Sequence, residues 1–265
     1  MRELTFGFSP CPNDTFAFHA LVHGLVDAPF TVRPVLLDIE ELNRRARTAE
    51  LELTKLSFGA LRGAQGYEML RSGAALGHGC GPLVVARERM TLAEAAARRV
   101  AIPGRDTTAF LLLRVFAPEI DSGDTVELRY DEILGAVAGG DVDAGLIIHE
   151  SRFTYRDHGL ERVADLGELW EARTGLPVPL AAICAREDLD ESLRRDVERA
   201  LRASVEYAFA HPDASIDYVR AHSQELSDDV CRQHIELYVN EFSIDLGAEG
   251  LAAIDALVAE PAASY

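Results

Sequence analysis

Four groups of polar residues in this sequence each occur at or just after a short apolar run that is typical of a buried strand. They are Ser9, Asn13 and Asp14; Lys55 and Ser57; Thr107 and Thr108; and His149 with Glu150. In open parallel sheets, ligands bind outside the carboxyl ends of the strands, and a helix that follows directs free backbone N–H groups to the same place. The pattern predicts a site for an anionic ligand. The alternative is that each Ser, Thr or Asn is only a helix N-cap.

His149 ends the apolar run 144–148 and is the best candidate for a catalytic residue. An imidazole, with an unperturbed pKa of about 6.5, exchanges protons readily near neutral pH. The sequence has no G-x-S-x-G nucleophile elbow, so a lone general base is favoured over a catalytic triad. The competing interpretation is a core histidine whose ring is satisfied by a backbone carbonyl.

The 26 basic residues include a single lysine, Lys55. Strand alternation would place Lys55 and Ser57 on one face, so the ammonium either binds an anion there or is an ordinary surface charge. His78 lies between two glycines of the segment 73–82, which could expose it to the same cleft. His19 and His23 are spaced as metal ligands can be, but no third ligand follows, so no metal site is expected.

The charge balance excludes several classes of partner. A formal net charge of −18 repels nucleic acid and anionic lipid over most of the surface.

No run approaches the roughly 18 apolar residues of a membrane span. The chain opens on Arg2 and Glu3 without a secretory signal, and its four cysteines form no C-x-x-C pair. We therefore expect a cytoplasmic protein with reduced thiols.

Short apolar runs alternate with amphipathic segments along most of the chain, which is typical of an α/β fold with largely parallel strands. From residue 190 to residue 257 the pattern is helical, and such a tail cannot form a strand-rich domain of its own. It is expected to pack on the first part of the chain. This predicts two lobes with a ligand cleft between them: residues 1–92 with 178–265, and residues 93–177.

The segments that carry the polar clusters closely resemble the 1,4-dihydroxy-6-naphthoate synthases of menaquinone biosynthesis. They are 7–15 (GFSPCPNDT), 53–57 (LTKLS), 102–109 (IPGRDTTA) and 145–151 (GLIIHES), with 173–177 (RTGLP) in addition. The similarity covers nearly the whole chain. It implies an α/β fold similar to that of type II periplasmic binding proteins, with a cleft between the lobes, adapted as a cytoplasmic enzyme.

The resemblance further implies a lyase of the futalosine pathway, which converts the carboxylate cyclic dehypoxanthinylfutalosinate to 1,4-dihydroxy-6-naphthoate and dihydroxyacetone without a metal or organic cofactor. It assigns the general base to His149. It assigns substrate binding to Lys55, Leu56, Ser57, Thr108, Ala109 and Asn43, and Thr107 is expected beside them. Two rival interpretations are a non-catalytic solute-binding protein, against which the missing secretory signal counts, and the related chorismate dehydratase, against which the His149 motif counts.

Overall fold

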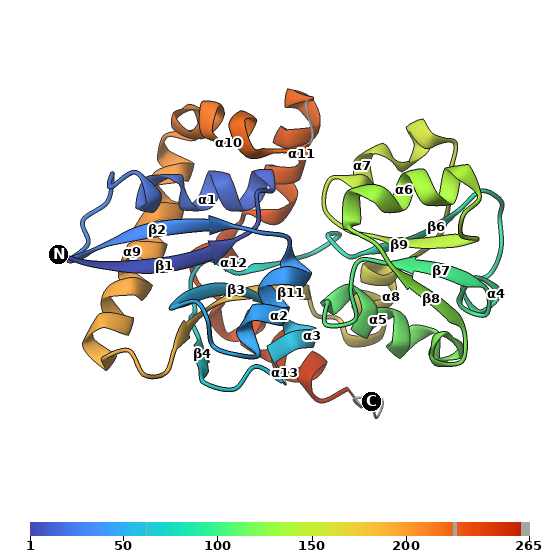
Figure 1. Cartoon of the computed structure of the whole chain (residues 1–265), viewed down its shortest axis with the longest axis horizontal. Coiled ribbons are helices and arrows are strands. Elements are labelled where there is room, and N and C mark those ends of the chain that lie inside the picture. Colours follow the sequence, from blue (N-terminus) through green and yellow to red (C-terminus); the bar gives the residue numbers. More distant parts are fainter. Residues whose placement is uncertain (62, 225–226, 261–265) are drawn as a thin grey trace.

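Two lobes, each built on its own β-sheet, make up the structure, a computed structural model that describes residues 1–61, 63–224 and 227–260 (Figure 1). The chain crosses from the first lobe to the second between β5 (Ala75–Gly77) and β6 (Leu83–Ala86). It returns between α8 (Leu166–Thr174) and β11 (Val178–Arg186). None of the helices in the described part of the chain combines the length and the apolar character that a membrane span needs.

The sheet of the first lobe has the strand order β2-β1-β3-β11-β4, with β5 also paired to β11. Its further strands are β1 (Arg2–Phe8), β2 (Phe30–Leu36), β3 (Leu53–Ser57) and β4 (Tyr67–Met69). The helices of this lobe are α1 (Pro12–Val22), α2 (Ile39–Ala46), α3 (Phe58–Leu61), α9 (Glu191–Ala210), α10 (Ile216–His222), α11 (Asp228–Tyr238), α12 (Glu241–Ile244) and α13 (Gly247–Val258). In the view of Figure 1, α1, α10 and α11 lie above the sheet, and α2, α3 and α13 lie below it.

The sheet of the second lobe has the order β10-β6-β9-β7-β8. Its further strands are β7 (Arg99–Ile102), β8 (Asp124–Glu127), β9 (Ala144–Ile147) and β10 (Glu161–Asp165). Its further helices are α4 (Leu92–Ala96), α5 (Thr108–Phe116), α6 (Tyr130–Gly139) and α7 (Ser151–Thr154). Helices α6 and α7 lie on one side of this sheet, and α5 and α8 on the other (Figure 1).

Both sheets are mixed, so the expectation of largely parallel strands is wrong. The strand β1 is parallel to β2 and β3, and β7 is parallel to β8 and β9. However, β11 is antiparallel to β3, β4 and β5, and β6 is antiparallel to β9 and β10. These two strands enter directly from the other lobe, without the crossover helix that returns a chain to a parallel position. The pairing of β6 also places residues 83–86 in the second sheet, whereas the boundaries expected from the sequence put residues 83–92 in the first lobe.

The helical tail packs on the first lobe. Helix α9 buries an apolar face that includes Val197, Leu201 and Val205 in the same core as the strands and α1. Between the two helices, the buried Ser204 hydroxyl donates to the Ala17 carbonyl (2.7 Å) and accepts from the backbone N–H of Leu21 (3.1 Å). Because each of these buried polar groups has a partner, the hydrogen bonds offset the cost of removing them from water. The tail therefore completes the core behind the sheet.

The start of α8 packs backbone against backbone on the loop before β6. A Cβ atom on Gly81 would lie 2.3 Å from the Cα atom of Gly167, so Gly81→Ala must push the helix away. We expect the free energy of unfolding to fall by roughly 1–3 kcal/mol, as overpacking does in other cores. Urea denaturation measures this change. As a control, Gly135→Ala in α6 adds a Cβ to open space and should stabilise the protein by roughly 0.5–1 kcal/mol. A Gly81→Ala variant as stable as the parent would contradict the packing described.

Candidate active site

The polar clusters that follow β1, β7 and β9, and the one on β3, contribute side chains to one pocket between the lobes. The first lobe contributes Ser9, Asn13, Lys55 and Ser57, and the second contributes Thr107, Thr108, Ala109 and His149. The rest of the wall is mostly apolar and includes Ile39, Ala75, Cys80, Pro82, Ile148, Leu180 and Ala181, together with His234 and Tyr238. The cavity measures about 70 Å³, whereas ligand pockets usually hold about 300–1,000 Å³. A ligand of that size therefore fits only if the walls of this pocket move apart.

A buried ion pair lies at the wall of the first lobe. The Lys55 ammonium pairs with Asp14 Oδ1, and both side chains are almost fully buried. Asp14 also accepts hydrogen bonds from the Ser9 backbone N–H (3.1 Å), the Ser9 hydroxyl (2.7 Å) and the Asn13 amide (2.9 Å). It lies in the first turn of α1, where the helix dipole favours a negative charge. Lys55 is thus no surface charge, and Asp14 balances most of its positive charge.

Ser57 reaches the pocket with its hydroxyl oriented by Asn43. The Asn43 amide donates to Ser57 Oγ (3.1 Å), and its carbonyl oxygen accepts from the Ser57 backbone N–H (3.0 Å). Since Oγ accepts a hydrogen bond from Asn43, its own hydrogen is available to a ligand. Asn43 itself lies behind the pocket wall. The side chain of Leu56 packs on the other face of β3, with Ala46, Tyr67 and Cys184, and does not line the pocket.

The two threonines at the start of α5 use their hydroxyls within the protein. Thr107 is the N-cap: its hydroxyl accepts from the Phe110 backbone N–H (3.1 Å). The Thr108 hydroxyl donates to the Leu180 carbonyl on β11 (2.6 Å) and therefore joins the two lobes. The N-cap interpretation thus holds for Thr107. The N–H groups of the first turn have no carbonyl partner within a helix, and Thr108 and Ala109, which carry two of them, line the pocket.

His149 has a strained backbone, and one of its ring nitrogens has no hydrogen-bond partner among the described residues. Its φ of 58° lies in the left-handed region, which residues other than glycine adopt at a cost that functional sites often tolerate. Within residues 1–61, 63–224 and 227–260, Nε2 is buried without a hydrogen-bond partner. Burial, aided by the positive charge of Lys55 and opposed by Asp14, lowers the pKa of His149 to about 4. The imidazole is therefore neutral at pH 7 and can accept a proton.

His234 belongs to the site although no sequence motif marks it. It is fully buried and lines the pocket. Its Nε2 donates to Asn13 Oδ1 (3.0 Å), since the Asn13 amide nitrogen already donates to Asp14. Burial and the nearby His149 lower the pKa of His234, so this ring is also neutral. The helical spacing of Cys231, His234 and Tyr238, which form the buried face of α11, was the available signal.

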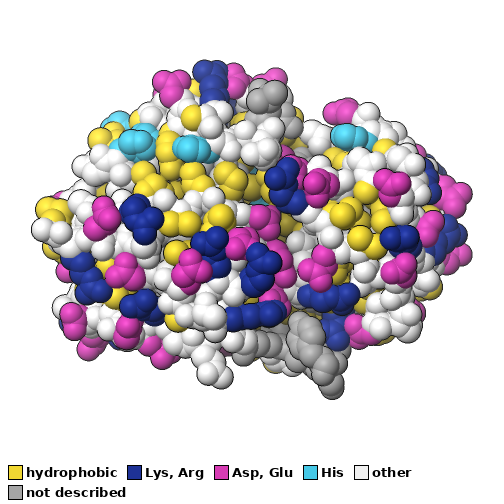
Figure 2. Space-filling view, in the orientation of Figure 1, with side chains coloured by type: hydrophobic (Ala, Val, Ile, Leu, Met, Phe, Trp, Pro, Cys, Tyr) yellow, Lys and Arg dark blue, Asp and Glu magenta, His cyan; other side chains and the backbone are white. Residues whose placement is uncertain are grey.

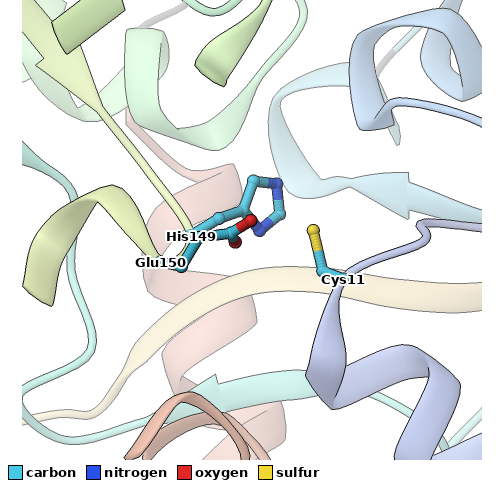
Figure 3. A group of neighbouring side chains, drawn as sticks. All are labelled: Cys11, His149 and Glu150. Carbon is cyan, nitrogen blue, oxygen red and sulfur yellow. The ribbon is translucent and has the colours of Figure 1, made fainter. Parts of the chain in front are cut away.

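Three ligand-type groups converge beside the pocket: Cys11 from the first lobe, and His149 and Glu150 from the second (Figure 3). Their nearest donor atoms lie within 4.8 Å of one another. Metal binding needs a thiolate, but burial raises the pKa of the Cys11 thiol well above its usual value. The thiol instead donates to the Tyr130 hydroxyl (3.9 Å), which donates to Glu150 Oε1 (3.3 Å). The absence of a metal site stays a prediction.

His78, a possible cleft residue, lies outside the pocket. The chain turns outward after β5 through Gly79, whose φ is +66°. This leaves the imidazole exposed, with Nδ1 3.3 Å from Glu171 on α8 and Nε2 3.9 Å from Glu249 on α13. Of the two flanking glycines, Gly77 ends the buried strand β5, and Gly79 forms the surface turn. Surface charges of both signs are interspersed elsewhere as well, as the face in Figure 2 shows.

The Lys55 and Asp14 pair generates a stability prediction. Lys55→Met leaves a buried carboxylate without its counter-ion, which should lower the free energy of unfolding by about 3–5 kcal/mol. Adding Asp14→Asn removes the isolated charge and should recover part of that loss. Chemical denaturation of the single and double variants measures both effects. The matched control is Arg2→Met, because the pair of Arg2 with Glu52 is exposed and such pairs contribute at most about 1 kcal/mol. A loss no larger than the control's would contradict the prediction.

Comparison with known proteins places the chain in a family. A sequence model described as menaquinone biosynthesis matches residues 4–262. A 1,4-dihydroxy-6-naphthoate synthase of Thermus thermophilus is 56% identical over 261 residues, which are 98% of this chain and 94% of the relative. One of Streptomyces coelicolor is 46% identical over 264 residues, covering 98% and 93% of the two chains.

Solved structures agree on the fold. A protein of Archaeoglobus fulgidus superposes with a TM-score of 0.90 at 36% identity, covering 96% of this chain and 95% of the other. A Candida albicans protein, described as having the generic periplasmic binding protein fold, superposes with a TM-score of 0.66 at 12% identity, covering 100% and 92%. The second likeness concerns the fold alone. The chain belongs to the menaquinone-biosynthesis family whose curated relatives are named 1,4-dihydroxy-6-naphthoate synthase, and it has the two-lobed fold of periplasmic binding proteins.

Proposed function

We propose that this protein is a carbon–carbon lyase that converts cyclic dehypoxanthinylfutalosinate to 1,4-dihydroxy-6-naphthoate and dihydroxyacetone. The observation that carries the proposal is the neutral imidazole of His149, whose Nε2 lies buried without a partner among the described residues, in a pocket between the lobes. The names of the relatives support the product. The substrate and the role of the base are our inference.

The carboxylate on the substrate's ring system binds at the junction of the lobes. Ser57 has a hydroxyl hydrogen to donate from the first lobe, because Asn43 occupies its acceptor side. The first-turn N–H groups at Thr108 and Ala109 donate from the second lobe, where the dipole of α5 adds a positive field. Lys55 adds little net charge, because Asp14 neutralises it. Neutral donors thus bind the anion within an acidic protein.

His149 acts as the general base. Its Nε2 accepts a proton from the substrate, and the electron pair left behind is used to break the carbon–carbon bond to the three-carbon unit. The imidazolium then returns the proton to that departing fragment, and the remaining ring system becomes aromatic. Asp14 partly offsets the effect of burial and of Lys55 on the imidazolium. Closed lobes keep water from the intermediate.

The direct test is to incubate the purified protein with the cyclic substrate and follow the naphthoate chromophore together with dihydroxyacetone. Equimolar formation of both products supports the proposal. Tight binding without turnover would instead indicate a solute-binding protein. Consumption of chorismate, and not of the cyclic substrate, would indicate the related dehydratase.

His149→Asn is expected to slow turnover strongly while the substrate still binds. Asparagine tolerates a left-handed backbone but cannot act as a base, so kcat should fall by about 10²- to 10⁴-fold. Stopped assays measure kcat, and isothermal titration calorimetry measures binding. His78→Asn is the matched control, because His78 lies outside the pocket, and it should keep the parent's rate. An active His149→Asn variant would exclude His149 as the base.

The pH dependence of kcat follows from the environment of His149. The base works in its neutral form, and its pKa in the pocket is about 4. Provided that the bound substrate leaves this pKa unchanged, kcat at saturating substrate should stay level as the pH falls through 6.5 and should drop about tenfold per pH unit only below about 4. Circular dichroism at each pH verifies that the protein is folded. A decline with a midpoint near 6.5 would show that a histidine with an ordinary pKa limits the rate.

A further inference from the structure

We propose that Glu40 is a positioning residue that joins the two halves of the carboxylate-binding site when the lobes close. The inference rests on the proposed function, because it concerns the same bound carboxylate. Glu40 lies in the first turn of α2, in the first lobe, and it does not line the pocket. It acts through the residues that do.

The two oxygens of the Glu40 carboxylate have partners in different lobes. Oε1 accepts the backbone N–H of Asp106 in the second lobe (3.2 Å), and Oε2 accepts the amide of Asn43 in the first lobe (3.2 Å). Asp106 immediately precedes Thr107, the N-cap of α5, and Asn43 orients Ser57. A single carboxylate thus links the α5 end of the site to its Ser57 end.

The loop between β7 and α5, residues 103–107, leaves space for this carboxylate. Gly104 has a φ of +145°, and a Cβ atom there would lie 2.2 Å from Glu40 Cδ. Only glycine allows the side chain to approach the backbone so closely. The salt bridge between Arg47, the residue after α2, and Asp106 spans the same junction. The loop therefore contacts both ends of α2.

The charge of Glu40 responds to pH near neutrality. The pKa of Glu40 is raised to about 7, mainly by burial; the hydrogen bonds from Asp106 and Asn43 oppose this rise, and the charges of Asp106 and Glu127 add to it. The neighbouring acids have partners: Asp106 pairs with Arg47, and Glu127 with Arg105. An ionised carboxylate accepts hydrogen bonds more strongly than a protonated one. The contact between the lobes should therefore weaken as the pH falls below about 7.

Glu40→Ala tests the proposal by the separation of KM from kcat. Loss of a charged acceptor shared by both lobes should raise KM by about tenfold, in line with hydrogen bonds to charged groups, while kcat stays within about twofold because His149 is untouched. Glu41→Ala is the matched control. Glu41 also lies in the first turn of α2, but its partners Arg44 and Arg45 are on the same helix, so KM should not change.

Glu40→Gln separates the charge from the shape. An amide oxygen can still accept from Asp106, so KM should rise less than in Glu40→Ala. The increase of KM that we expect for the parent between pH 8 and pH 6 should be absent, because the glutamine does not titrate. A merely structural role for Glu40 would leave the pH dependence of KM as it is in the parent.

Hydrogen exchange provides a readout without substrate. In the parent, the hydrogen bond to Glu40 protects the Asp106 N–H from exchange. The peptide over residues 104–107 should therefore exchange faster in Glu40→Ala, and its exchange rate should be unchanged in Glu41→Ala. Equal exchange in all three proteins, or an unchanged KM in Glu40→Ala, would overturn the proposal. If the parent itself does not turn over the cyclic substrate, the proposed function fails, and the exchange result still decides the contact between the lobes.

Discussion

The ion pair between Asp14 and Lys55 holds together the part of the first lobe that faces the pocket. A buried charge without a partner is strongly destabilising, so the first turn of α1 and the strand β3 must stay in contact. Asp14 also binds Ser9 and Asn13, and Asn13 in turn binds His234 on α11. Three segments that are distant in the sequence, residues 9–14, β3 and α11, are thereby fixed around one carboxylate. The isolated lysine of this arginine-rich chain has a structural role at the wall of the site.

The location of the site could be predicted from the sequence because it depends on local patterns. Apolar runs followed by polar residues mark the carboxyl ends of buried strands, and those ends meet between the lobes as expected. The alternation along β3 likewise places Lys55 and Ser57 on one face. Such patterns extend over only a few residues, so tertiary packing does not override them.

Other parts of the site depend on packing that no local pattern records. His234 contacts Asn13 across 221 positions of the sequence, and its place on a tail rich in charges suggested a surface residue. The direction of β6 and β11 depends on where the chain crosses between lobes, not on the hydrophobicity of either strand. The hydroxyls of Thr107 and Thr108 were expected to serve a ligand, yet the fold uses them as a cap and as a contact between the lobes.

The pairing of β11 with β3 also bears on how the chain folds as it is synthesised. The strand β3 remains unpaired on one edge until β11 has left the ribosome, more than a hundred residues later. All five strands of the second sheet are complete before β11 is made. The inserted lobe can thus fold first and bring the two crossing segments together. Nascent chains that stop before β11 would expose an unpaired sheet edge. Such an edge can pair with another chain and aggregate unless a chaperone covers it.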